Sequence, residues 1–342
     1  MNNDTSTRKR LSGRMKAAVY ERYGSPDVLR IAEVPKPIPE KDEVLIQVHA
    51  ASVNYSDPTF VSGKPFLVRL MGAGLFRPKN PILGADIAGV VEATGSDVAG
   101  FRPGDEVFGD LSSCGYGGFA EYACATQDAI TLKPPGATYD DAAAVPQAAC
   151  TALQGLRDAG GIASGHQVLV NGASGGIGTF AVQIARWLGA EVTGVCRTAN
   201  MEMVSSLGAD RVIDYTRENF TAGGPRYDLI FDIVANQSVS KYAAALSPTG
   251  TYVACAFNPT SLLMGPLLSR KGGKTVRSLI SRPSSADLGL LSGLLDDGDI
   301  KPVIDRLYPL TEVAEAIRHY GEGHARGKVV ITVADKKGLS DG

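Results

Sequence analysis

Three glycines at three-residue spacing, Gly172, Gly175 and Gly178, stand between an apolar strand-like run at 167–170 and a helix-like run at 178–188. A turn of this kind must tolerate positive φ, bring its backbone close to a pyrophosphate without a Cβ in the way, and offer helix N–H groups to the anion. The expected contacts of the dinucleotide in this turn are Gly172, Ser174, Gly175, Gly176, Ile177 and Gly178. The plainer alternative is a tightly packed helix start.

The alternation of strand-like and helix-like runs continues after the turn and supports the dinucleotide interpretation. Further strands are expected at 191–196, 211–213, 228–234 and 251–256, and helices at 200–207 and 238–246. Repeated βα units predict a parallel sheet with helices on both faces.

The first third of the chain has a different pattern. Short strand-like runs separated by prolines and glycines predict compact, barrel-like β structure. These runs lie at 16–20, 29–34, 44–53, 87–94 and 106–108. An alanine-rich helix is expected at 140–156, another at 284–297, one capped by Thr311 through about Tyr320, and a final strand at 328–333.

Composition excludes several classes of protein. The 342 residues carry a net charge of −2 with no long charged run, so neither nucleic acid nor a membrane surface is an expected partner. No apolar stretch reaches the roughly 20 residues needed to span a bilayer. Five widely spaced cysteines predict free thiols and a cytoplasmic location. Residues 1–14 are interpreted as a disordered polar tail, with a short basic transit segment as the alternative.

The end of the second expected strand of the βα region indicates which dinucleotide is bound. NAD-binding folds place an Asp or Glu there for the ribose 2′-OH, whereas this chain has Arg197 and Thr198. Arg197 is suited to pair with a 2′-phosphate, and Thr198 to donate to it. The sequence therefore favours NADP(H), the alternative being that Arg197 is a solvated surface residue.

A series of motifs from Met15 to Val333 resembles the medium-chain dehydrogenase/reductase superfamily, in its zinc-independent quinone oxidoreductase branch. Within that branch the chain is similar to the reticulon-interacting-protein-like reductases. The motifs, besides the glycine turn, are Ser52-Val-Asn54-Tyr-Ser-Asp57, Leu83-Gly-Ala-Asp-Ile-Ala-Gly89, Arg102-Pro-Gly-Asp-Glu-Val107, Gly118-Phe-Ala-Glu-Tyr122, Ala142-Ala-Ala-Val-Pro146, Gly208-Ala-Asp-Arg-Val-Ile-Asp-Tyr215 and Gly327-Lys-Val-Val330.

The resemblance implies an α/β plus β fold: a GroES-like β-barrel catalytic domain with an inserted Rossmann dinucleotide-binding domain, and a homodimer. The implied domains are 15–137 for the first part of the catalytic domain, 138–275 for the Rossmann domain and 276–342 for the return to the catalytic domain.

The resemblance also implies cofactor contacts. Tyr215 matches a family tyrosine near the adenosine phosphate, Asn54 an asparagine near the nicotinamide, and Lys328 a lysine that returns to the cleft. Sheet-edge backbone bordering the nicotinamide is implied for Val234, Ala256 and Phe257. In the alternative interpretations Lys328 is a surface lysine and Asn54 caps a turn.

The resemblance also implies that the catalytic metal is missing. Zinc-dependent relatives have a Cys where this chain has Asn54, and Gly-His-Glu where it has Gly84-Ala85-Asp86. Ala85 has no donor atom, and catalytic zinc needs three protein ligands. No metal is therefore expected. Alcohol–aldehyde interconversion depends on a Lewis acid that polarises the oxygen. Hydride delivery to an activated C=C depends on one less, because the conjugated carbonyl spreads the developing negative charge.

Three functions remain open. The leading one is NADPH-dependent reduction of quinones or α,β-unsaturated carbonyls, with Asn54 positioning the ring and Tyr55 or water giving a proton. Tyr55 is alternatively a core residue, and Asp86 is a candidate to orient the loop bearing Asn54. The second function is an NADPH-binding adaptor without turnover, and the third a specialised pathway reductase or cyclase. The apolar segments 60–77 and 258–275 favour a small hydrophobic carbonyl or quinone as substrate, the alternative being packing between the domains.

Overall fold

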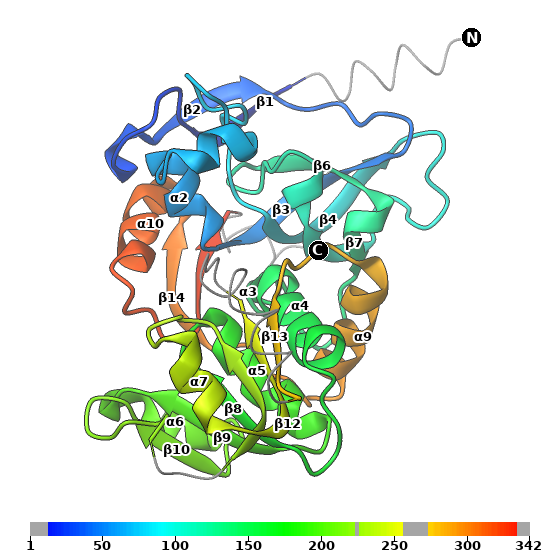
Figure 1. Cartoon of the computed structure of the whole chain (residues 1–342). Helices are drawn as coiled ribbons and strands as arrows, with labels where there is room; N and C mark the ends of the chain where they lie inside the picture. Colours follow the sequence, from blue (N-terminus) through cyan, green and yellow to red (C-terminus); the bar gives the residue numbers. More distant parts are fainter. Residues whose placement is uncertain (1–12, 223–225, 256–272, 334–342) are drawn as a thin grey trace. The chain divides into compact units, whose positions relative to one another are not determined.

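A computed structural model describes residues 13–222, 226–255 and 273–333, and these form two units. Among them, unit 1 takes the chain to Gln147, then 283–296 and 304–333; unit 2 takes 148–282 and 297–303. Figure 1 labels most of the helices and strands of both. Unit 2 interrupts unit 1 in the sequence, as the resemblance implied, but residues 138–147 belong to unit 1 and 276–282 to unit 2, so the expected boundaries were each displaced by several residues.

Unit 1 is built on β structure. A long β3 (Glu43–Val53) lies between β15 (Lys328–Thr332) and β4 (Asp86–Thr94) and also pairs with β6 (Tyr122–Thr126). The remaining strands of this unit are β1 (Arg14–Val19), β2 (Arg30–Pro35), β5 (Glu106–Asp110), β7 (Ile130–Leu132) and β14 (Ile304–Pro309). The return of β15 to the side of β3 places residues 274 positions apart next to each other, which matters for the site below.

Unit 2 is a parallel six-stranded sheet in the order β10-β9-β8-β11-β12-β13. This order is that of the dinucleotide-binding fold, with its reversal point between the first and fourth strands, here β8 and β11. Its strands are β8 (Gln167–Asn171), β9 (Glu191–Cys196), β10 (Arg211–Asp214), β11 (Tyr227–Asp232), β12 (Leu246–Ala254) and β13 (Thr275–Ser278). The predicted Rossmann architecture is confirmed.

The helices of unit 2 flank this sheet. Helix α5 lies against β8 and β9, α6 against β9 and β10, and α7 against β12 (Figure 1). Their bounds are α5 (Gly176–Trp187), α6 (Met201–Ser206) and α7 (Val239–Ala245). Phe180 and Ile184, four residues apart on α5, are both fully buried and so lie on one face of the helix.

The remaining helices are α2 (Ser56–Ser62), α3 (Tyr139–Ala144), α4 (Pro146–Gln154), α9 (Ser285–Asp296) and α10 (Val313–Gly321). The single helix expected at 140–156 is divided into α3 and α4 at Pro146, because proline has no N–H for a continuing helix. Thr311 does not cap α10: it lies in a preceding 3-10 turn, and Glu312 occupies the cap position. Arg14, expected in the tail, begins β1.

Within the described residues, no helix is long and apolar enough to span a bilayer.

Candidate functional site

The glycine turn in unit 2 holds two glycines that the fold itself requires. A Cβ on Gly178 would lie 2.0 Å from the carbonyl oxygen of Gly172, a distance that no side chain can tolerate. Gly172 has φ of +90°, and a Cβ there would lie 2.7 Å from Val234 Cγ2. These two positions fit the plainer interpretation of tight packing as well as they fit nucleotide binding.

Gly175 is different, because nothing among the described residues requires it to be a glycine. Its backbone is extended (φ −86°, ψ 178°), and a Cβ there would meet no atom closer than the Gly172 oxygen at 3.6 Å. It is the N-cap residue of α5, a helix of 12 residues. Open space over a glycine at the N-terminus of a helix is what a bound pyrophosphate needs. The residues present therefore fit a dinucleotide.

The end of β9 places Arg197 and Thr198 beside the end of β10. Arg197 is half-buried and has no acidic partner within the described ranges. Thr198 donates its hydroxyl to Asp214 Oδ2, so in this structure the hydroxyl expected to contact a phosphate is already engaged. Asp214 also accepts from Thr216 N and Oγ1 at 2.9 and 2.7 Å, and these hydrogen bonds, Thr198's first, lower its pKa.

Asn200 is a residue at this end of the sheet that the sequence analysis missed. It is buried, and its Nδ2 donates to Ser174 Oγ in the glycine turn at 3.0 Å. Its Oδ1 is buried with no hydrogen-bond partner among the described residues. Tyr215, whose backbone N–H bonds to Cys196 O at 3.1 Å, keeps a side chain that is 43% exposed. In the sequence Asn200 only begins an expected helix, and nothing there predicts that its side chain contacts the glycine turn.

A buried carboxylate fixes the point where the strand order reverses. Asp232 ends β11 and is fully buried. Its Oδ1 accepts from Asn171 Nδ2 at 2.8 Å and from the backbone N–H groups of Val234 and Ala235 at 3.2 and 2.9 Å, while Tyr252 donates to Oδ2 at 2.7 Å. Val234, an expected cofactor contact, is held this way with its side chain half exposed. Ala256 and Phe257 lie outside the described residues.

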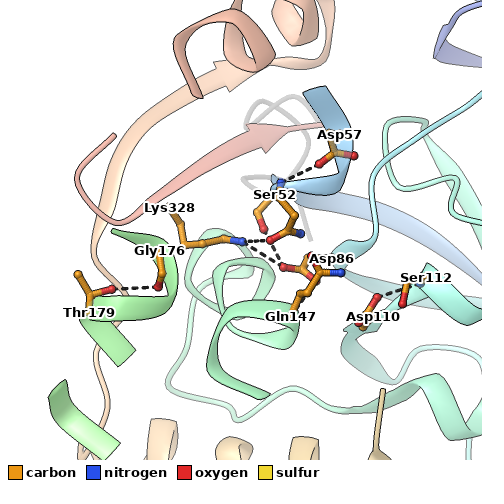
Figure 2. A network of polar contacts seen from close by, with 10 residues as sticks. Ser52, Asp57, Asp86, Asp110, Ser112, Gln147, Gly176, Thr179 and Lys328 are labelled. Carbon is orange, nitrogen blue, oxygen red and sulfur yellow. Dashed lines mark hydrogen bonds and ion pairs between the residues drawn. The ribbon is translucent and has the colours of Figure 1, made fainter. Parts of the chain in front are cut away.

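Unit 1 holds a second polar cluster around Lys328, at the start of β15 (Figure 2). The side chain is 2% exposed, so the alternative of a surface lysine is wrong. Its ammonium donates to Asn54 Oδ1 at 2.5 Å and to Asp86 Oδ2 at 3.2 Å. Asp86 is fully buried and also accepts from Ser52 Oγ at 3.1 Å and from the backbone N–H of Gln147 at 3.0 Å.

The backbone of Asn54 is held by Asp57, whereas Asp86 bonds the neighbouring Ser52 and the Lys328 ammonium. The Asp57 carboxylate accepts from Asn54 N at 2.7 Å and from Gly84 N at 3.3 Å, which joins the start of α2 to the loop before β4. Asp57 thus holds the backbone of this loop, and the role expected for Asp86 in orienting it stays a prediction. The sequence had a signal for this, since Asx side chains commonly accept from a backbone N–H three residues away.

Burial raises the pKa of Asp57 to about 7, opposed by the two backbone hydrogen bonds. Because this pKa exceeds the unfolded value of 3.8, the folded state binds the proton more tightly. The group's contribution to the free energy of unfolding is thus complete below pH 4 and is lost as the pH rises to about 7. We expect wild type to lose on the order of 2–4 kcal/mol more than Asp57→Asn between pH 4 and 8. Urea unfolding across this range measures it, and a constant difference between the two proteins would contradict it.

Comparisons with known proteins agree with this architecture. A family model described as "Alcohol dehydrogenase GroES-like domain" matches residues 40–135, and one described as "Zinc-binding dehydrogenase" matches 207–331. The chloroplast envelope quinone oxidoreductase homolog of Arabidopsis thaliana is 34% identical over 331 residues, covering 93% of this chain and 98% of the relative. The chain belongs to the medium-chain dehydrogenase/reductase superfamily. Its place is in the zinc-independent quinone oxidoreductase branch.

Two further similarities extend over nearly the whole superfamily fold. The 2-methylene-furan-3-one reductase of Solanum lycopersicum is 33% identical over 348 residues, covering 96% of this chain and 81% of the relative. The solved quinone oxidoreductase of Coxiella burnetii superposes with a TM-score of 0.85 at 30% identity, covering 94% of this chain and all of that one. Membership makes this chain an oxidoreductase that uses a nicotinamide dinucleotide.

The positions that hold zinc in the zinc-dependent members of the superfamily carry different residues here. Asn54 and Asp86 both engage the Lys328 ammonium, and Ala85 between them in the pattern is fully buried. Within the described part of the chain, no three His, Cys, Asp or Glu side chains are grouped so that they could hold a metal ion. The donor set left at these positions does not fit the three-ligand requirement of catalytic zinc.

Two tyrosines are candidates to supply a proton in this reductase. Tyr55 is 74% exposed, so the alternative of a core tyrosine is wrong. Tyr116 has a left-handed backbone (φ +69°), and its ring packs edge-on against Phe60 at 5.5 Å between centroids. Burial, then the charges of Asp57 and Asp110, raise the pKa of Tyr116 to about 12, so it stays protonated at neutral pH.

Proposed function

We propose that this chain is an NADPH-dependent, zinc-independent reductase of quinones or α,β-unsaturated carbonyls. The observation that carries the proposal is the chemistry at the zinc positions, where Asn54, Ala85 and Asp86 offer hydrogen bonds and charge in place of a metal-ligand set. A conjugated carbonyl or quinone accepts a hydride with less help from a Lewis acid than an aldehyde does. The names of the Arabidopsis and tomato relatives, a quinone oxidoreductase and an enone reductase, support the same substrate class.

In this proposal, residues of unit 2 bind the cofactor and residues of unit 1 contact the substrate. The turn 172–178, with Ser174, would hold the pyrophosphate, and the backbone after Asp232 would border the nicotinamide. When bound, the reduced nicotinamide supplies the hydride. Asn54 offers a hydrogen bond in unit 1, and Tyr55 or water supplies the proton. Exposed Phe66, Leu70 and Phe76 in the segment before β4 support a hydrophobic substrate.

The test of the function is NADPH oxidation with a panel of small enones and benzoquinones, followed by absorbance at 340 nm. Turnover with at least one class is the expected result. Tight NADPH binding without turnover on the whole panel would replace the proposal by the adaptor alternative. A homodimer and a cytoplasmic location belong to the proposal as well. The superfamily resemblance supports the dimer, and five free cysteines support a reducing compartment.

Arg197 is proposed as the side chain that selects NADPH. We expect Arg197→Ala to weaken NADPH binding by about 1.5–3 kcal/mol, the contribution of a hydrogen bond to a charged group, and to leave NADH binding nearly unchanged. Fluorescence titration of both nucleotides measures this difference. Arg211→Ala is the matched control, because Arg211 lies at the opposite end of the sheet, at the start of β10. An equal loss for the two nucleotides would reject Arg197 as the phosphate ligand.

A further inference from the structure

The Lys328 cluster places a buried ammonium group between two residues of the zinc-ligand pattern. The ammonium lies 2.5 Å from Asn54 Oδ1 and 3.2 Å from Asp86 Oδ2, and its side chain is 2% exposed (Figure 2). Burying a charge is costly unless it is paired and hydrogen-bonded. The fold pairs this ammonium with the Asp86 carboxylate, which Ser52 and the Gln147 backbone hold in turn. The buried ammonium is therefore paired with a carboxylate that two further hydrogen bonds hold in place.

The ammonium also decides which way the Asn54 amide points. An ammonium group only donates hydrogen bonds, so it must face the amide oxygen and cannot face the nitrogen. Asn54 Nδ2 consequently points away from Lys328. This nitrogen is buried and has no hydrogen-bond partner among the described residues, although Asn54 as a whole is 5% exposed. A buried donor without a partner costs free energy, which a ligand oxygen would recover.

We propose that Lys328 is a positioning residue that acts through Asn54, and that Asn54 Nδ2 donates to the carbonyl oxygen of the substrate. The proposal rests on the reductase function given above. It differs from the cofactor-contact role that the family resemblance implied for Lys328, because the ammonium is already engaged within the protein. When the amide oxygen accepts a hydrogen bond from the ammonium, electron density is drawn toward that oxygen, and the Nδ2–H becomes a stronger donor.

The chemistry explains why such a donor would matter. The hydride adds to the β-carbon, the π pair of the C=C bond becomes a double bond between the α-carbon and the carbonyl carbon, and the π pair of the C=O bond moves onto the oxygen, so that an enolate results while NADPH becomes NADP⁺. A proton from water or a tyrosine then adds to the α-carbon and gives the saturated ketone. The oxygen is more negative in the enolate than in the ketone, so a fixed donor there favours the transition state over the ground state. Asn54 thus would take the part that a metal plays in zinc-dependent relatives.

A set of four proteins tests the proposal: wild type, Lys328→Met, Asp86→Asn and the double variant. Lys328→Met leaves Asp86 buried without its partner, so a lower melting temperature is expected. The double variant removes both charges together, and its melting temperature should return close to that of wild type. For each protein the NADPH dissociation constant, kcat and KM for an enone, and the affinity for 4-nitrophenolate, an aryl oxyanion resembling the enolate, are measured.

We expect the double variant to bind NADPH as wild type does, yet to lose up to roughly 100-fold in kcat, because the Asn54 amide would no longer be held with Nδ2 as an oxyanion-stabilising donor. Its affinity for 4-nitrophenolate should fall at least tenfold, a readout independent of turnover. Normal kcat and phenolate binding in a folded double variant would overturn the proposal and leave Lys328 a structural role. Loss of NADPH affinity instead would make Lys328 a cofactor ligand. A wild type inactive on the whole panel would overturn the reductase function itself.

Discussion

Gly175→Ala should weaken NADPH binding at least roughly tenfold, or about 1.4 kcal/mol, while the protein unfolds at the same urea concentration as wild type. The protein leaves room for this methyl group, since the nearest heavy atom would be 3.6 Å away and the backbone is extended. Any cost must therefore come from the ligand, whose pyrophosphate needs the space next to the backbone. Isothermal titration with NADPH and urea unfolding of the same preparation measure the two quantities.

Gly178→Ala is the matched variant, three residues further along the same turn. Its Cβ would lie 2.0 Å from the Gly172 carbonyl oxygen and 2.8 Å from the Ala173 backbone, so the helix would have to shift. We expect a loss of about 3 kcal/mol in the free energy of unfolding, at the upper end for overpacking. Unchanged NADPH affinity in Gly175→Ala would leave the plainer interpretation of the turn, tight packing alone, in place.

The dinucleotide-binding unit could be predicted from sequence because its signals are local. The turn from Gly172 to Gly178 lies between an apolar run and a helix-period run, so a window of about 20 residues contains the motif and its context. The strand β9 was predicted with its observed bounds, Glu191–Cys196. The family resemblance then supplied the interrupted catalytic unit, which no local pattern could show.

The parts that sequence reasoning missed depend on partners far apart in the chain. Strand β6 pairs with β3, and β14 pairs with β15, but neither sequence, YACAT or IDRLYP, alternates apolar and polar residues. The Lys328 ammonium reaches Asn54 across 274 residues of sequence, and only the pairing of β15 with β3 brings them together. Asn200 reaches Ser174 because β9 and β8 are neighbours. Each of these contacts is set by strand order.

The same dependence on strand order gives Asp232 its importance. Asp232 and Asn171 end the two strands on either side of the reversal point, and their side chains meet at 2.8 Å. The carboxylate accepts hydrogen bonds from two backbone N–H groups, one side-chain amide and one phenol. It is fully buried, so water does not reach it. Its removal would leave several buried donors without an acceptor at once.

We therefore expect Asp232→Ala to lower the free energy of unfolding by about 3–5 kcal/mol, the range for breaking a buried hydrogen-bonded charge. NADPH affinity should fall as well, because the backbone of Val234 and Ala235 would no longer be fixed. Asp228→Ala is the control: it lies on the same strand, near the opposite end, is only half-buried, and accepts from the Gln167 N–H at 3.0 Å. Its loss should cost about 1 kcal/mol and leave NADPH binding unchanged. Equal losses of unfolding free energy and of NADPH affinity in the two variants would contradict this prediction. Asp232 would then stabilise its strand no more than Asp228 does and would have no separate role in the nucleotide site.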